Sequence, residues 1–326
     1  MYSGLNHIYR LVWDNVREAW VPVSEHCKSC GKGVARRAAL TGKLSVLAVA
    51  VLPGVVNAFT AEVDDGMAVF DEVLSSGNTQ NVNSGGTVTN TAIYTSGLQN
   101  VNDGGIAIST TIYNSGRQNV NSGGITSNTV IESYGKQSVY GGGVAIGTVI
   151  RGSDGKWGRQ DVNGGGTANG TTISKYGQQV IYGGTANDTV IEGGIQKLSG
   201  GIANGTVING GEQYIYNGGI ANSTVINGGG QYVEGGGTAN DTTVNSGGKL
   251  QVNAGGTALG VIQNSGAALV TNTDATVSGT NALGAFSIDA ATGIASNVLL
   301  ENGGRFIVNT GDTATDTTIN TGGYVT

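Results

Sequence analysis

The chain has 326 residues, of which 59 are glycine and 12% are charged, and its formal net charge is −6. Residues 59–326 hold nine basic and nineteen acidic residues, so that 9 − 19 gives −10, and they contain no His, Cys or Pro. This composition excludes Ser-His-Asp and Cys-His catalysis, and metal sites built from His or Cys, in that part of the chain, while its acidic balance disfavours nucleic acid as a partner.

Residues 1–58 predict an export signal. Three basic residues, Arg36, Arg37 and Lys43, precede the apolar run Leu44–Val56, and small residues end the segment at Asn57 and Ala58. A basic region, an apolar core of about a dozen residues and a small-residue cleavage site define a secretory signal peptide. The apolar run is too short for a transmembrane helix. We therefore expect export, with cleavage after Ala58 or two or three residues later.

The front of this signal is unusually long. It carries the stretches NHIYRLVWDN at residues 6–15 and EAWVPVSE at residues 18–25. They resemble the extended signal peptide of large type V (autotransporter) proteins of Gram-negative bacteria, with a pattern close to N-x-x-Y-x-x-V-W-N followed by W-V-x-V-S-E. Asp14 departs from the usual Asn and Pro22 from the usual Ala.

Two cysteines, Cys27 and Cys30, form a C-x-x-C pair within the same segment. Such a pair can bind metal or work in redox chemistry, but here no second pair exists and the segment is expected to be removed. We assign it neither role. The lack of Cys in residues 59–326 fits a chain that crosses a second membrane unfolded, because a disulfide would persist in an oxidising compartment.

Residues 59–77 are acidic and lack the full repeat that follows, so we expect them to cap the first coil of a repeat domain, where a sheet edge would otherwise be exposed.

One short pattern then repeats over residues 78–256. A glutamine marks the same place in most copies, at Gln80, Gln99, Gln118, Gln137, Gln160, Gln178, Gln196, Gln213 and Gln231, and Leu250 follows in that column. The steps between them are 19, 19, 19, 23, 18, 18, 17, 18 and 19 residues. A fixed period of this length predicts a solenoid, in which each repeat buries its apolar side against its neighbours.

Each repeat holds two short alternating runs rich in Val, Ile, Tyr and Thr, which favour strands, and glycine pairs between the runs predict corners. The predicted fold is all-β, a right-handed parallel β-helix (β-solenoid) of 17–19-residue repeats with about thirteen coils, each rising roughly 4.8 Å. We expect Asn and Thr columns to stack as ladders. The interior is predicted to hold Val101, Val120, Val207, Ile208 and Val225.

The repeat is lengthened from within at one place. The step from Gln137 to Gln160 is 23 residues, about four over the period, and the extra residues fall in 151–159. An insertion in a solenoid coil maps to a projecting loop, often on the binding face. The candidate binding loop comprises Arg151, Lys156, Trp157 and Arg159, because an exposed Trp beside cations can stack on sugars or hold an acidic partner. The alternative, which is the favoured one, is that Trp157 folds back and covers a corner, as a tolerated change in repeat length.

Residues 257–297 are irregular, and the repeat then resumes, with 313–320 copying 238–245 closely. One repeat domain, residues 78–326, fits better than several, because solenoids grow without a single core. Residues 297–326 lack the alternating strands and aromatic girdles of an outer-membrane barrel. As given, the chain is therefore expected to carry no translocator barrel, and to stay in the periplasm if it ends at Thr326.

The repeats resemble those of the AIDA-type autotransporter adhesins, whose passengers repeat G-G-x-A-x-x-T-x-V-x-x-G-G-x-Q-x-V; residues 236–252, GGTANDTTVNSGGKLQV, follow this pattern. The resemblance implies a cell-surface or outer-membrane location, adhesion to host cells or to other bacterial cells, and an outer-membrane barrel, which is absent here. It also implies an O-heptosyltransferase as a partner that modifies Ser and Thr.

The residues disfavour glycoside hydrolysis, calcium binding and N-linked glycosylation. A glycosidase needs two carboxylates about 5–10 Å apart, whereas the acids here scatter; Asp188, Asp241 and Asp316 share a column that other copies fill with Gly or Ser. Calcium β-rolls need an Asp that most copies lack. Five N-x-T sequons begin at Asn169, Asn187, Asn204, Asn222 and Asn240; glycosylation is one explanation, and a stacked Asn ladder is the favoured one.

These observations predict an adhesin or self-association passenger that makes multivalent surface contacts, without catalytic residues, cofactor or metal. The alternatives are a structural stalk or spacer, or a truncated remnant that is not displayed. The least favoured hypothesis is a β-helix enzyme that acts on polysaccharides.

Overall fold

The computed structural model describes residues 9–14, 19–24 and 59–326, which fall in two separate units. In the first unit, β1 (Tyr9–Asp14) and β2 (Ala19–Ser24) pair as antiparallel strands. The predicted cleavage site at Ala58 and the Cys27/Cys30 pair lie outside the described residues. Within the described part, no helix is long and apolar enough to cross a membrane.

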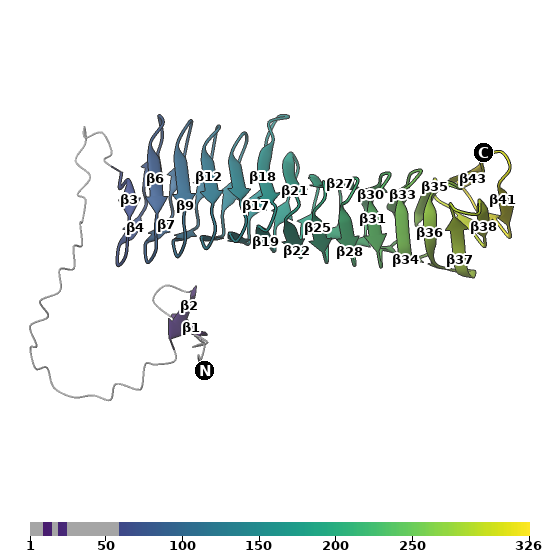
Figure 1. Ribbon diagram of the computed structural model, residues 1–326, viewed down its shortest axis with the longest axis horizontal. Helices are drawn as coiled ribbons and strands as arrows, with labels where there is room; N and C mark the ends of the chain where they lie inside the picture. The colour runs from purple at the N-terminus through teal and green to yellow at the C-terminus, as the bar shows by residue number, and fades with distance from the viewer. Residues whose placement is uncertain (1–8, 15–18, 25–58) are drawn as a thin grey trace, which may run out of the picture. The chain divides into compact units, whose positions relative to one another are not determined.

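The second unit is a parallel β-helix (Figure 1), as the repeat predicted. One strand of every coil joins a 14-stranded sheet, in which neighbours pair in parallel. This gives fourteen coils, one more than the repeat count suggested, because residues 59–77 also form one. The strands are β3 (Glu62–Val63), β6 (Thr79–Val82), β9 (Leu98–Val101), β12 (Arg117–Val120), β15 (Lys136–Val139), β18 (Gly158–Asn163), β21 (Gly177–Tyr182), β24 (Ile195–Leu198), β27 (Glu212–Ile215), β30 (Gly229–Val233), β33 (Gly248–Val252), β35 (Ala268–Asn272), β40 (Arg305–Ile307) and β43 (Tyr324–Val325).

Two shorter strands complete each regular coil and belong to a 25-stranded sheet. The first of the two are β4 (Ala68–Phe70), β7 (Thr87–Thr89), β10 (Ile106–Ile108), β13 (Ile125–Ser127), β16 (Val144–Ile146), β19 (Thr167–Asn169), β22 (Thr185–Asn187), β25 (Ile202–Asn204), β28 (Ile220–Asn222) and β31 (Thr238–Asn240). The second are β5 (Val73–Leu74), β8 (Ala92–Ile93), β11 (Thr111–Ile112), β14 (Val130–Ile131), β17 (Val149–Ile150), β20 (Thr172–Ile173), β23 (Val190–Ile191), β26 (Val207–Ile208), β29 (Val225–Ile226) and β32 (Thr243–Val244).

A bend with left-handed backbone separates these two short strands. Asp188, Asp241 and Asp316 occupy this bend with φ of 53°, 54° and 53°, and Gly170 and Gly205 fill it in other coils with φ of 64° and 66°. Gly, Asn and Asp tolerate this conformation better than other residues. The column of acids in the sequence therefore has a backbone explanation, and the bend of any one coil holds at most one acid.

The interior is filled by columns of like residues, and two of the five predicted core positions were wrong. Val101, Val120 and Ile208 are fully buried. Val207 and Val225, the first residues of β26 and β29, are only half-buried. Side chains alternate between faces along a strand, so in β26 and β29 only the second residue points inward. Columns of Ala and Thr, which the sequence did not mark as core, are also interior.

The glutamine column is buried and forms a hydrogen-bonded ladder. The Nε2 of Gln118 donates to Oε1 of Gln99 at 2.7 Å, and the hydroxyl of Thr110 donates to the same oxygen at 3.3 Å. The pattern recurs from coil to coil, which satisfies amides that would be costly to bury alone. Gln179, not Gln178, occupies this column beside Gln160, so the predicted register there was wrong by one residue.

Asparagine ladders run along the outside, as predicted. In one of them Asn187 donates to Asn169 at 2.8 Å and Asn204 donates to Asn187 at 2.9 Å. The Thr of each N-x-T triplet, such as Thr189 and Thr206, is buried and donates to the glutamine column. The ladder explanation of the five sequons is therefore confirmed: Asn stacks outside while Thr faces the core.

Three ladders begin on a carboxylate of the first coil. Glu72 accepts from Nε2 of Gln80 at 2.5 Å, Glu62 from Nδ2 of Asn81 at 2.7 Å, and Asp64 from Nδ2 of Asn83 at 2.8 Å. In each of these ladders the amide donates towards the preceding coil, so the first coil supplies the acceptor. Three of the acids in residues 59–77 take this role.

The coil path departs from the repeat near the irregular stretch predicted at 257–297. After β34 (Thr257–Gln263), the strands β36 (Thr276–Asn281), β37 (Gly284–Asp289) and β38 (Ile294–Ser296) pair antiparallel. Because of this excursion, β35 pairs directly with β40. The parallel stack resumes with β39 (Leu299–Leu300), β41 (Thr313–Thr315) and β42 (Thr318–Ile319).

Candidate functional site

The insertion forms a small hairpin at the corner that leads into β18. Eight residues separate Ile150 from Arg159, whereas four separate Ile131 from Lys136 in the preceding coil. Ser153 and Lys156 form an isolated antiparallel bridge around the turn residues Asp154 and Gly155, whose φ values are 51° and 76°. The hairpin leaves the register of β18 with its neighbours intact.

Trp157 lies at the end of this hairpin against the next coil. Its ring meets Tyr176 edge to face, with centroids 5.9 Å apart and planes at 86°. This geometry is favourable for aromatic pairs and fixes the indole, yet the residue remains 38% exposed. Trp157 therefore does both things that the sequence left open: it packs against a corner and presents part of its ring to solvent.

The two arginines of the loop are held in ion pairs. Nη2 of Arg151 lies 2.7 Å from Oε1 of Glu132, and this hydrogen bond raises the pKa of Arg151. Arg159 lies 2.6 Å from the nearly buried carboxylate of Asp161. Burial lowers the pKa of Arg159, but the hydrogen bond to Asp161 and its charge outweigh burial, and the net shift is upward. Lys136 binds the other oxygen of Asp161 at 2.7 Å.

Three consecutive corners beyond the loop are shorter than those on either side. Four residues lie between Ile173 and Gln178 and four between Val244 and Lys249. Only three residues lie between the equivalent positions of the intervening coils, namely Ile191 and Ile195, Ile208 and Glu212, and Ile226 and Gly230. The surface is therefore notched over three coils.

Glycine makes the notch possible. The shortened corners are Gly193-Gly194, Gly210-Gly211 and Gly228-Gly229. Gly211 and Gly229 have φ of 79° and 73°, and a Cβ on either would overlap the carbonyl oxygen of the glycine in the preceding coil. No larger residue fits at these two positions without a backbone shift, because conformation and space both exclude it.

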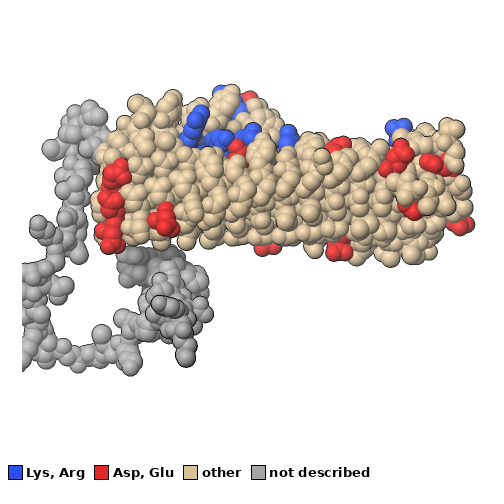
Figure 2. Space-filling view, viewed as in Figure 1, with Lys and Arg blue, Asp and Glu red and all other residues tan. Residues whose placement is uncertain are grey.

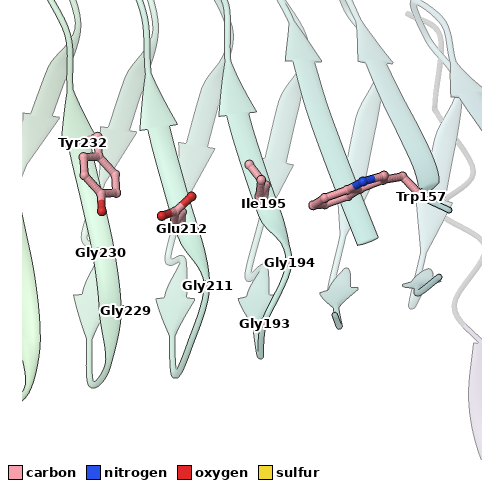
Figure 3. A pocket seen from close by; sticks show the side chains of 9 residues that line it. All are labelled: Trp157, Gly193, Gly194, Ile195, Gly211, Glu212, Gly229, Gly230 and Tyr232. Carbon is pink, nitrogen blue, oxygen red and sulfur yellow. The ribbon is translucent and has the colours of Figure 1, made fainter. Parts of the chain in front are cut away.

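A groove of about 320 Å³ occupies the notch. Its lining side chains are Trp157, Ile195, Glu212 and Tyr232, and glycine backbone lines the rest. Figure 3 shows Ile195, Glu212 and Tyr232 in a row on three successive coils, with Trp157 at the end of the row and the glycines beside it. We call this the notch groove.

Carboxylate and aromatic groups of the notch groove support each other. Oε2 of Glu212 accepts a hydrogen bond of 2.8 Å from the hydroxyl of Tyr214. The ring of Tyr214 stacks on Tyr232 with centroids 4.8 Å apart, and Nζ of Lys249 lies 4.5 Å from the centre of the Tyr232 ring. Desolvation, followed by the hydrogen bond to Glu212, raises the pKa of Tyr214, which therefore stays protonated as a donor.

The four loop residues predicted from the sequence do not converge on one point. Trp157 lines the notch groove, while Arg151 and Arg159 point to Glu132 and Asp161 and do not line it. The sequence analysis did not identify Glu212 and Tyr232 as site residues, nor the glycines whose backbone lines the groove. The signal that could have found them was the short steps of 17, 17 and 18 residues that separate Gln179, Gln196, Gln213 and Gln231.

Charge is unevenly distributed along the β-helix. Residues 116–232 hold seven basic and six acidic residues, a balance of 7 − 6 = +1, whereas residues 59–115 hold six acidic and no basic ones. Residues 233–326 hold two basic and seven acidic residues, which gives 2 − 7 = −5. In Figure 2 the Lys and Arg side chains gather on one face over the middle coils. The notch groove thus lies in the least acidic part of the β-helix.

Two family models match the chain. One, described as "Adhesin of bacterial autotransporter system, probable stalk", matches residues 210–267 and 278–326. The other, the extended signal peptide of the type V secretion system, matches residues 6–54.

Individual relatives agree with these matches. The chain is 63% identical over 46 residues to Autotransporter CRAC of Citrobacter rodentium, and this match spans 14% of the chain and 3% of that protein. Among solved structures, the TibC-catalyzed hyper-glycosylated TibA55-350 fragment is 32% identical with a TM-score of 0.55, covering 79% of this chain and 96% of the fragment. An endo-xylogalacturonan hydrolase from Aspergillus tubingensis matches with a TM-score of only 0.22 and 11% identity.

Proposed function

Since the chain belongs to the family of AIDA-type autotransporter adhesin passengers, we propose that its β-helix is a surface adhesin that binds host cells or other bacterial cells. The extended signal peptide and the autotransporter relatives support export to the cell surface or outer membrane. Adhesin passengers of this type are generally not enzymes, and we propose the same for this chain.

The observation that carries this proposal is the strict register of the coils. Successive coils place the same side chain at the same position, as in the outer Asn column from Asn169 to Asn240. A surface that repeats a contact at a fixed spacing can sum weak interactions into stable attachment. The side-chain ladders hold that spacing, so the repeated contacts stay aligned with each other.

The experiment is attachment of protein-coated beads. Beads that carry the full exported chain should clump with each other or attach to epithelial cells, whereas beads that carry an unrelated β-helix of equal net charge should do neither. Coated beads that stay dispersed and fail to attach would contradict an adhesive role.

A stalk is the second candidate, because the matching family model is itself described as a stalk. A stalk needs stiffness and length but no partner on its sides, and continuous ladders through the stack would supply the stiffness. Two results together would favour the stalk. Beads coated with this β-helix would stay inert, and shortening the β-helix by several coils would weaken adhesion made by another part of the same protein.

We also propose an O-heptosyltransferase as a partner. The related TibA fragment carries glycans added by TibC, and this chain offers outward-facing Thr at the first position of several short strands, among them Thr167, Thr185 and Thr238. Mass spectrometry of the chain produced with and without such a transferase tests this. An unchanged mass would contradict it.

A further inference from the structure

The notch groove combines a fixed aromatic ring, an oriented carboxylate and a floor without side chains. Trp157 leaves 38% of its surface exposed at one end, held by Tyr176. Glu212 lies in the middle, and Tyr214 takes only one of its two oxygens. A Cβ placed on Gly193 would make only ordinary van der Waals contact, 3.6 Å from the backbone nitrogen of Lys175, so a side chain can be added there without a clash.

We propose that the notch groove binds a short oligosaccharide of neutral sugars, with one ring against Trp157 and hydroxyl groups donating to Glu212. The apolar face of a sugar ring packs on an indole as other flat apolar surfaces do, and hydroxyl donors to a carboxylate form the stronger, charge-assisted kind of hydrogen bond. Three coils at roughly 4.8 Å each make the notch about 14 Å long, which favours a chain over a single sugar. The inference deepens the proposed adhesive role by naming a ligand class for it.

Other occupants fit the groove less well. A peptide that adds a strand needs a free sheet edge, but the strands under the groove, β24 and β27, are paired on both sides. An ammonium cage needs aromatic rings within about 6 Å of one cation, whereas β21, β24 and β27 lie between β18, which follows Trp157, and β30, which carries Tyr232. An acidic sugar would face the carboxylate of Glu212 directly.

The primary test is a glycan array probed with the full exported chain. We expect retention on one or more neutral oligosaccharides. Free oligosaccharide should then change tryptophan emission, and this change should vanish in Trp157→Phe, because Trp157 is the only Trp after residue 58. Trp157→Phe should still bind the array, because it keeps an aromatic ring.

Variants locate the site. Trp157→Ala and Glu212→Gln should each weaken binding on the order of tenfold, as expected for central contacts. Gly193→Leu should block the groove while the circular dichroism spectrum stays unchanged. The matched controls are Tyr134→Ala, an exposed corner aromatic outside the groove, and Asp103→Asn, an exposed carboxylate in an early coil that does not line the groove; both should bind as the parent does.

The outcomes separate this inference from the proposed function. Failure to bind any neutral oligosaccharide, retention on acidic glycans alone, or binding that survives in folded Gly193→Leu would each overturn the inference. If coated beads still adhere in those cases, the adhesive role stands without this ligand. Saccharide binding without bead adhesion would leave the groove assignment intact and contradict the adhesive role. Adhesion that depends on the groove but resists glycosidase treatment of the cells would point to a protein ligand and also overturn the inference.

Discussion

Buried amides are part of the core of this β-helix, beside its columns of Val, Ile and Ala. Each glutamine of the inner column donates to the preceding coil and accepts from the following one, and a threonine hydroxyl supplies a further donor in most coils. An amide in such a position is stabilising only while both neighbours remain. Removing one glutamine leaves a buried donor unpaired, which costs about 1–3 kcal/mol.

We therefore expect Gln179→Leu to lower the free energy of unfolding by about 1–3 kcal/mol, because Gln196 would lose its acceptor. Gln178→Leu is the matched control: it changes the adjacent, half-exposed glutamine of the same strand, and such surface changes stay within about 0.5 kcal/mol. Denaturant midpoints of the two variants measure the difference. Equal midpoints would show that the ladder contributes nothing measurable.

The same comparison applies to the two-residue strand β26. Ile208→Asp would place an unpaired carboxylate in the core and should cost more than about 4 kcal/mol. Val207→Asp, at the half-buried neighbour, should cost only about 1 kcal/mol. Thermal melts followed by circular dichroism would reveal the order, and a lower melting temperature for Val207→Asp would contradict the burial described above.

At the scale of elements, the corners decide where the surface rises and where it is hollow. One corner gains four residues and projects as the loop of Trp157, and three later corners lose one residue each and open the notch. The strands keep their register through both changes. The fold thus tolerates variation in corner length, which is where a repeat protein can acquire a site.

The notch depends on glycine at Gly211, where an added Cβ would overlap the carbonyl of Gly194. We expect Gly211→Ala to destabilise the chain by about 2 kcal/mol or more. Gly193→Ala lies in the same notch, but its Cβ would make only ordinary van der Waals contact with Lys175, so the change should stay within about 0.5 kcal/mol. Chemical unfolding of both proteins checks this, and a neutral Gly211→Ala would mean that the corner backbone can shift without cost.

Much of the fold could be predicted from the sequence, because the repeat period gives the length of each coil and the glycine pairs mark its corners. The choice between Val207 and Ile208 could not, since a run of two residues has no alternation to read. Gln178 and Gln179 were confused because adjacent identical residues satisfy the period almost equally well. The groove could not be predicted from the sequence, because Trp157 lines it together with residues more than 35 positions later in the chain, beyond the coil of Tyr176.

For the whole molecule, contacts between neighbouring coils dominate, and stability should be close to a sum over coils. Deletion of residues 99–117, a complete coil, joins Leu98 to Gln118 and leaves the glutamine column continuous. We expect this protein to fold, with a β-type spectrum and only a modest loss of stability.

Deletion of residues 99–107 is the control, because it removes about half a coil and shifts every following side chain out of its column. It should unfold or aggregate. Limited proteolysis distinguishes the two deletions, and equal resistance to protease would contradict a stack that depends on column register.

The common direction of the ladders gives the β-helix an electrical polarity. Every amide in the glutamine column points its donor towards the first coil, so the amide dipoles add along the stack as peptide dipoles add along an α-helix. The partial positive end lies at Gln80, where Glu72 accepts its Nε2, and the column stops at Leu250, which has no amide. The acidic first coil therefore does for this stack what an acidic N-terminal residue does for a helix, and the two ends of the stack are not interchangeable.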